Sequence, residues 1–80
     1  MRTSKIKVGI VGAAGYTGGE TLRLLLQHPD VEIVCAQSRS QADKSIAEVH
    51  KDLLGETDLQ FASEIKQQVD VLFLCLSHGE

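Results

Sequence analysis

The fold of this chain is decided by residues 7–20, which read KVGIVGAAGYTGGE. Residues 6–11 form a short run rich in β-branched side chains, which is typical of a parallel strand buried on both faces. Glycines then follow at positions 12, 15 and 18, and an amphipathic pattern of helical period begins directly after them. A strand, a glycine turn and a helix in this order predict a turn that can hold phosphate groups.

The three glycines have different expected roles. Gly12 lets the chain turn sharply off the strand, and Gly15 lets the backbone approach a pyrophosphate with no Cβ in the way. Gly18 lies on the apolar face of the helix, where a missing side chain permits close packing on the sheet. The helix start offers N–H groups and the positive end of a dipole. We therefore predict that Gly12, Gly15, Tyr16, Thr17 and Gly18 bind a cofactor.

The first residue of the helix can be read in two ways. Thr17 and Glu20 have the spacing of a capping box, which would begin the helix at Thr17. The glycine pattern instead begins it just after Gly15, near Tyr16. The helix is expected to end near His28, because the residue before a proline disfavours the α conformation.

The rest of the chain predicts one sheet. Residues 33–35 form a second strand, which completes a strand–helix–strand unit of the usual size, about 30 residues. Further expected elements are a helix over 45–54, a strand over 59–61, a short helix over 63–68 and a buried central strand over 69–76. The expected fold class is α/β, a Rossmann-like doubly wound parallel sheet. Residues 1–80 are expected to be the N-terminal part of a dinucleotide-binding domain, without a catalytic domain.

Ligands of such sheets bind beyond the carboxyl ends of the strands. Three segments are expected to meet there: the glycine turn and two polar stretches. The two polar stretches consist of Ser38, Arg39 and Ser40 after the second strand, and Ser77, His78 and Gly79 after the last.

The end of the second strand indicates which cofactor is preferred. A carboxylate there would bind the adenosine ribose of NAD, whereas an arginine accommodates the 2′-phosphate of NADP. Glu32 lies at the wrong end of its strand, and Asp43 comes several residues too late. Arg39 could be an ordinary solvated loop charge, but it lies between two hydroxyls at the ligand edge. This pattern favours NADP over NAD.

Composition and charge exclude several function classes. The net charge of −3 gives no general attraction for nucleic acid or an anionic membrane. Cys35 and Cys75 each lie inside an apolar run and far from any Cys/His cluster, which indicates buried strand residues rather than metal ligands or a disulfide. No signal peptide is visible, and no apolar stretch reaches the roughly 20 residues of a membrane span. We expect a reduced, cytoplasmic protein with no bound metal.

The three histidines have different expectations. His28 is expected to interact with carbonyl groups at the helix end, and His50 to be a surface helix residue. His78 follows a strand on the ligand edge, so it is a candidate for the nicotinamide pocket rather than for a catalytic base.

These residues carry a resemblance that covers essentially the whole chain. The run Gly12–Glu20, the leucine-rich helix and the segment His28–Val31 resemble the start of the N-acetyl-γ-glutamyl-phosphate reductases. Ser38-Arg39-Ser40 and Leu76–Gly79 are similar to the same family, although Ser77 stands where the family commonly has proline. The Gly-Tyr-Thr-Gly form and the terminal His78-Gly79 separate the chain fairly well from the related aspartate-semialdehyde dehydrogenases.

The resemblance implies an activity that the residues alone do not reveal. The family reduces an acyl phosphate to an aldehyde with NADPH in arginine biosynthesis, through a catalytic cysteine and an assisting histidine. Both lie beyond residue 80 in the family, so neither Cys35, Cys75 nor His78 matches them. The 80-residue chain alone is therefore predicted inactive, and the complete protein is expected to be a homo-oligomer acting on a small-molecule acyl phosphate. Two alternatives remain: an aspartate-semialdehyde dehydrogenase-like oxidoreductase and a non-enzymatic nucleotide-binding module.

Overall fold

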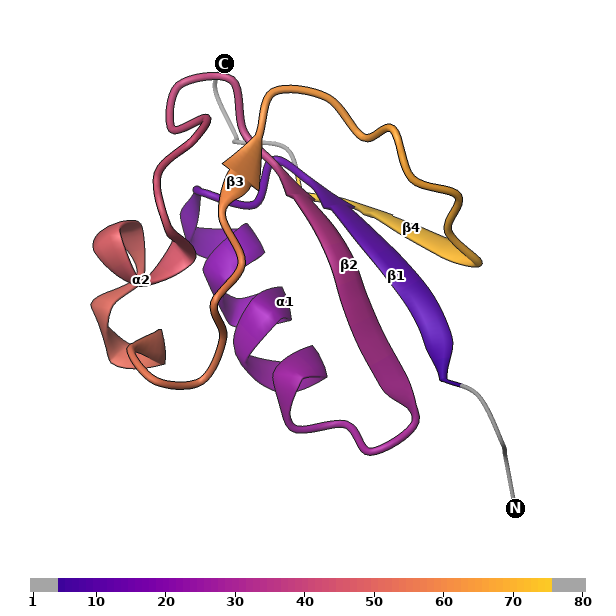
Figure 1. The fold of residues 1–80 in the computed structure, drawn as a ribbon. Helices are drawn as coiled ribbons and strands as arrows, with labels where there is room; N and C mark the ends of the chain where they lie inside the picture. The colour runs from indigo at the N-terminus through magenta and orange to yellow at the C-terminus, as the bar shows by residue number, and fades with distance from the viewer. Residues whose placement is uncertain (1–4, 76–80) are drawn as a thin grey trace.

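A computed structural model describes residues 5–75 of the chain. They form a four-stranded parallel sheet in the order β3-β2-β1-β4, with the helices on one face (Figure 1). In chain order the elements are β1 (Ile6–Val11), α1 (Tyr16–Leu26), β2 (Val31–Gln37), α2 (Ile46–Val49), the 3-10 helix η1 (Lys51–Leu53), β3 (Phe61–Ala62) and β4 (Val71–Leu74). The strand order reverses beside β1, as in a doubly wound fold. The predicted α/β, Rossmann-like class is confirmed.

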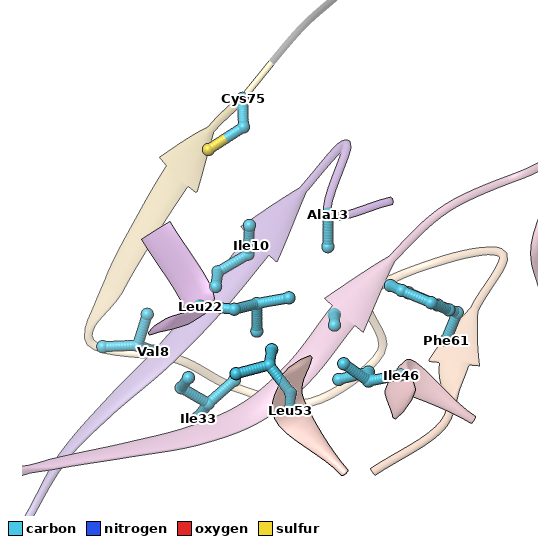
Figure 2. Packing of buried hydrophobic residues seen from close by; sticks show 10 residues of the cluster. Val8, Ile10, Ala13, Leu22, Ile33, Ile46, Leu53, Phe61 and Cys75 are labelled. Carbon is cyan, nitrogen blue, oxygen red and sulfur yellow. The ribbon is translucent and has the colours of Figure 1, made fainter. Parts of the chain in front are cut away.

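Strand β1 lies inside the sheet and has the predicted bounds. It pairs in parallel with β2 on one side and β4 on the other. Val8 and Ile10 are fully buried and share one hydrophobic cluster with Leu22 of α1 (Figure 2). The same cluster takes in Ile46 and Leu53, so α1, α2 and η1 cover one face of the sheet. This packing fixes the start of α1 relative to the end of β1.

Helix α1 begins at Tyr16, so the glycine pattern and not the capping box sets its start. Gly15 is the N-cap residue, and no side chain caps this helix end. The Glu20 carboxylate accepts a 2.6 Å hydrogen bond from Arg23 one turn further on instead of reaching back to Thr17. The predicted alternative that began the helix at Thr17 is wrong.

The two faces of α1 follow the leucine pattern. Leu22 is completely buried, whereas Leu24, which lies off the apolar stripe, is 72% exposed. The helix ends at Leu26, two residues earlier than the end expected from Pro29.

The region after β2 differs most from the prediction. Strand β2 is longer than residues 33–35, and the expected helix over 45–54 is divided into α2 and η1. Ser45 is the N-cap residue of α2 and forms a capping box with Glu48, in which the Ser45 side chain accepts from the Glu48 N–H and the Ser45 N–H donates to the Glu48 carboxylate at 3.2 Å. Strand β3 has two residues, Phe61–Ala62, where residues 59–61 were expected.

The predicted helix over residues 63–68 is wrong. This segment crosses the other face of the sheet without regular structure. A Cβ added to Gly9 of β1 would lie 3.2 Å from both Ile65 Cδ1 and Val69 Cγ1. The Ser63 carbonyl accepts a 3.0 Å hydrogen bond from Gln37 Nε2. Contacts with the sheet therefore replace the local bonds of a helix.

Strand β4 is apolar but is not a buried central strand in this structure. It pairs only with β1 among the residues described, and Val71, Leu72, Phe73 and Leu74 are 36–66% exposed. The prediction of a buried strand is wrong for these residues. An apolar run favours burial without specifying which segment provides it, and nothing within residues 5–75 pairs with the outer edge of β4.

Candidate functional site

The turn after β1 and the loop after β2 meet at one edge of the sheet, because parallel strands end on the same side (Figure 1). Between them lies an open groove of about 690 Å³. Its walls are the glycine turn on one side and the polar loop on the other. The lining residues are Val11, Gly12, Ala14, Gly15, Gln37, Ser38, Arg39, Ser40, Gln41 and Cys75. The groove lies beside the point where the strand order reverses, the usual ligand position of such sheets.

The glycine turn is held by β2. Gly12 has a φ of 75°, a left-handed conformation in which a side chain is strained. Its N–H donates to Gln37 Oε1 at 3.0 Å, and the N–H of Ala13 donates to the Gln37 carbonyl at 2.8 Å. Gln37 thus fixes the turn with both its side chain and its backbone.

Gly18 allows the helix to rest directly on the turn. A Cβ at this position would lie 2.5 Å from the Gly12 carbonyl oxygen and 2.6 Å from Cα and O of Ala13. These atoms belong to the backbone, so they cannot move aside as a flexible side chain does. The sequence prediction of close packing is therefore right in kind, although Gly18 touches the turn and does not line the groove.

The first turn of α1 supplies donors near the groove. Gly15 is extended at the N-cap position, and the first intrahelical bond runs from the Gly19 N–H to the Gly15 carbonyl at 2.9 Å. The N–H groups of Tyr16, Thr17 and Gly18 precede that bond and have no acceptor within the helix. The Tyr16 side chain is 84% exposed, and neither Tyr16 nor Thr17 lines the groove.

The second wall is a compact loop with exposed side chains at its tip. Ser38 is 6% exposed, its N–H donates to the Ala62 carbonyl at 2.9 Å, and its hydroxyl accepts from the Gln41 N–H at 3.2 Å. The first bond ties the loop to β3, and the second closes the loop on itself. Arg39 and Ser40 follow with exposed side chains that line the groove.

Comparison with known proteins agrees with this geometry. The family described as semialdehyde dehydrogenase, NAD binding domain, matches residues 7–80. The chain belongs to this family.

Relatives of this semialdehyde dehydrogenase domain carry a more specific name. The chain is 50% identical over 74 residues to the N-acetyl-γ-glutamyl-phosphate reductase of Christiangramia forsetii, covering 92% of this chain and 23% of the relative. The reductase of Phocaeicola vulgatus is 53% identical over 76 residues, covering 94% of this chain and 24% of the relative. The chain thus spans about a quarter of the length of these relatives.

A solved structure has the same fold. Aspartate semialdehyde dehydrogenase with NADP from Candida albicans superimposes with a TM-score of 0.73 at 27% identity. The match covers 92% of this chain and 24% of the other. The fold of residues 5–75 is therefore similar to part of a semialdehyde dehydrogenase solved with NADP.

Gln37 is a residue of this semialdehyde dehydrogenase site that the sequence analysis missed. Besides its bonds to the turn, its Nε2 donates to the Ser63 carbonyl at 3.0 Å. It is the last residue of β2. An amide side chain at the carboxyl end of the strand, directly before the polar loop, was the available signal, because an amide can donate and accept at once.

Two histidines behave differently from their predictions. His50 is half-buried and reaches the glycine turn, with Nε2 2.8 Å from the Ala13 carbonyl oxygen. The prediction of a surface helix residue is wrong, because η1 folds back against α1 and brings His50 inward. His28 Nδ1 accepts from the Asp30 N–H at 3.1 Å, so the ring does not donate to helix-end carbonyls at that atom.

Both cysteines are free and buried in the strand region, as predicted. Cys35 lies in β2, and burial raises the pKa of its thiol, which keeps the thiol protonated. Cys75 Sγ lies 3.4 Å from Thr21 Oγ1 and lines the groove.

Ser77, His78 and Gly79 lie outside the described residues. Within residues 5–75, no helix is long and apolar enough to cross a membrane, and no three metal-ligating side chains come together.

Proposed function

We propose that this chain is the NADP(H)-binding part of an N-acetyl-γ-glutamyl-phosphate reductase that uses a cysteine thioester in arginine biosynthesis. Reductases of that name are about 50% identical to it over more than nine-tenths of the chain. In this proposal residues 1–80 form the N-terminal part of the dinucleotide domain. The catalytic cysteine and histidine belong to a domain outside them, so the chain alone has no reductase activity.

The position of Arg39 carries the cofactor assignment. Its exposed guanidinium stands at the rim of the groove between two serine residues, where an NADP 2′-phosphate would lie. The preceding strand-end residue, Gln37, is committed to Gly12 and Ser63 and carries no charge. A guanidinium can bind a phosphate with two parallel hydrogen bonds, and the neighbouring Ser40 offers an exposed hydroxyl group, while the buried Ser38 holds the loop.

The opposite wall suits the pyrophosphate. The N–H groups of the first turn of α1 and the positive end of its dipole favour negative charge there. Gly12 and Gly15 line that wall and place no side chain between the backbone and a ligand. When bound, NADPH supplies the hydride, while the residues of the two walls bind and orient the cofactor. In this proposal Ser77, His78 and Gly79 complete the groove near the nicotinamide.

The test is a titration of the complete enzyme with NADP and NAD, for the wild type and for Arg39→Ala. In Arg39→Ala, the loss of charge-assisted hydrogen bonds is expected to lower the affinity for NADP by roughly 10-fold or more, with little change in the affinity for NAD. Lys44→Ala is the matched control, because it removes an exposed positive charge that does not line the groove. Equal weakening of both cofactors by Arg39→Ala would overturn the 2′-phosphate assignment.

One observation favours a second candidate. The Candida structure is an aspartate semialdehyde dehydrogenase, at 27% identity. Assays of the complete enzyme with N-acetyl-γ-glutamyl phosphate and with aspartyl phosphate decide between the two substrates.

If neither NADP nor NAD binds saturably, the third candidate, a non-enzymatic nucleotide-binding module, replaces both enzymes. We further propose a cytoplasmic homo-oligomer that binds neither nucleic acid nor membrane, which light scattering and cell fractionation test.

A further inference from the structure

His50 joins the α2–η1 segment to the glycine turn. Its own backbone is fixed on both sides, because its N–H donates to the Ile46 carbonyl at 2.8 Å and its carbonyl accepts from the Leu53 N–H at 2.9 Å. The imidazole then extends to the turn, where Nε2 lies 2.8 Å from the carbonyl oxygen of Ala13. Ala13 is completely buried. The contact spans 37 residues of sequence and ties the turn to a separate part of the fold.

The chemistry of this contact fixes the position of a proton. A carbonyl oxygen only accepts hydrogen bonds, so Nε2 must carry hydrogen for this bond to form. Both the neutral Nε2–H tautomer and the imidazolium meet that condition. The contact is therefore compatible with either charge state of His50.

The space for the ring is provided by a glycine. A Cβ on Gly19 would lie 2.7 Å from His50 Cε1 and 2.8 Å from Nδ1. On another side the ring meets Phe61 edge-to-face, with centroids 6.1 Å apart and an interplanar angle of 67°. The two adjacent glycines therefore serve different contacts, since Gly18 accommodates the backbone of the turn and Gly19 accommodates His50.

We propose that His50 is a positioning residue that orients the glycine turn for binding the cofactor phosphates, an inference that rests on the function proposed above. A trans peptide is planar, with its C=O and N–H pointing in opposite directions. By holding the Ala13 carbonyl, His50 directs the N–H of Ala14 away from itself. Ala14 lines the groove and His50 does not. One hydrogen bond on the buried side of the turn thus sets the direction of a donor on the ligand side.

The first experiment compares His50→Phe and His50→Gln in the complete enzyme. Phenylalanine keeps an aromatic ring against Phe61 but has no donor, whereas the glutamine amide can reach as far as Nε2 and donates. His50→Phe is expected to lower the affinities for NADP and NAD equally, by roughly fivefold, which corresponds to the loss of one hydrogen bond. His50→Gln should restore most of the affinity, and kcat at saturating NADPH should change little. His28→Phe is the matched control, because His28 is exposed and does not line the groove.

A second experiment covers the case in which His50→Phe does not fold. Gly19→Ala places a methyl group against the ring and should weaken both cofactors through the same contact. In a His50→Ala background that space is vacant, so Gly19→Ala should add little further loss, which a double-mutant cycle measures. Nitrogen-15 NMR of the wild-type imidazole should show a protonated Nε2.

The outcomes separate this inference from the proposed function. Three results would each overturn the role of His50 and leave the proposed function unaffected: an unchanged cofactor affinity in His50→Phe, additive effects in the double-mutant cycle, and an unprotonated Nε2. A wild-type enzyme that binds neither nucleotide would overturn the proposed function and the positioning role with it.

Discussion

The two walls of the groove are built in opposite ways. The glycine turn is shaped by backbone contacts in its interior, where Gly18 touches the peptide groups of Gly12 and Ala13. The facing loop is anchored through Ser38, but Arg39 and Ser40 present exposed side chains. Changes in the first wall are therefore expected to affect folding and every nucleotide, whereas changes at the tip of the second should affect only the choice between nucleotides.

The largest effect is expected for Gly18→Val. Its Cβ would lie 2.5 Å from the Gly12 carbonyl oxygen, so the turn and α1 must separate. Forcing added carbons into a closely packed site costs typically 1–3 kcal/mol and occasionally more, and a backbone neighbour places this change at about 3 kcal/mol or above. Urea denaturation measures it. Gly19→Val is the matched control and should cost clearly less, because the atoms that its Cβ would meet belong to the His50 side chain, which can move. Equal losses of stability in the two variants would contradict this distinction.

Gln37→Leu should come next. It removes the acceptor of the Gly12 N–H and the donor to the Ser63 carbonyl, and each unpaired group costs about 1–3 kcal/mol where it is buried. The affinities for NADP and NAD should fall together, which isothermal titration calorimetry can measure. Gln67→Leu, which loses only an exposed 3.4 Å contact to the Val34 carbonyl, is expected to change little. If only the affinity for NADP fell, Gln37 would instead act as part of the second wall, the polar loop after β2.

Ser40→Ala is expected to have a smaller effect, limited to one cofactor. If the 2′-phosphate binds where we propose, the loss of the Ser40 hydroxyl group should lower NADP affinity by roughly threefold, the range of a neutral hydrogen bond, with unchanged NAD affinity and thermal stability. Ser63→Ala is a suitable control, since its exposed side chain does not line the groove. A fall in melting temperature for Ser40→Ala would mean that the tip also supports the fold.

The smallest effect is expected away from both walls, at Asp52 of η1. The hydrogen bond from Arg23 holds the pKa of the Asp52 carboxyl below its ordinary value. A folded pKa below the unfolded one stabilises the protein above the unfolded pKa, and this contribution is lost as the pH falls through the folded pKa. Asp52→Asn should therefore be slightly less stable at neutral pH and indistinguishable in acid. Denaturation at both pH values, repeated in high salt, checks this, because exposed pairs are screened.

The sequence predicted the first wall better than the second half of the chain. β1, the glycine turn and the apolar face of α1 follow from contacts between residues close in sequence, with Gly18 meeting Gly12. The sequence allows two first residues for the helix, Tyr16 and Thr17, because both are locally possible. In the structure the helix begins at Tyr16, because Gly15 at the end of the turn occupies the N-cap position.

The errors occur where distant segments decide the outcome. Residues 63–68 form no helix, because Ile65 packs on Gly9 and Ser63 binds Gln37, both far away in sequence. The apolar sequence of β4 predicts a buried strand, but β4 pairs only with β1 within the described residues, so its outer edge is open. The sequence predicts His50 at the surface, because no residue near it in the chain indicates its contact with Ala13.

The sequence by itself determined the local features of this protein: a strand–turn–helix unit with glycines at the turn, and a polar loop with one arginine after the second strand. Only the tertiary structure decided how that turn is held, through Gln37 from β2 and His50 from the α2–η1 segment. The reason is physical. Backbone conformation and missing Cβ atoms are properties of single residues, whereas a hydrogen bond between residues 13 and 50 exists only after the sheet and helices have packed.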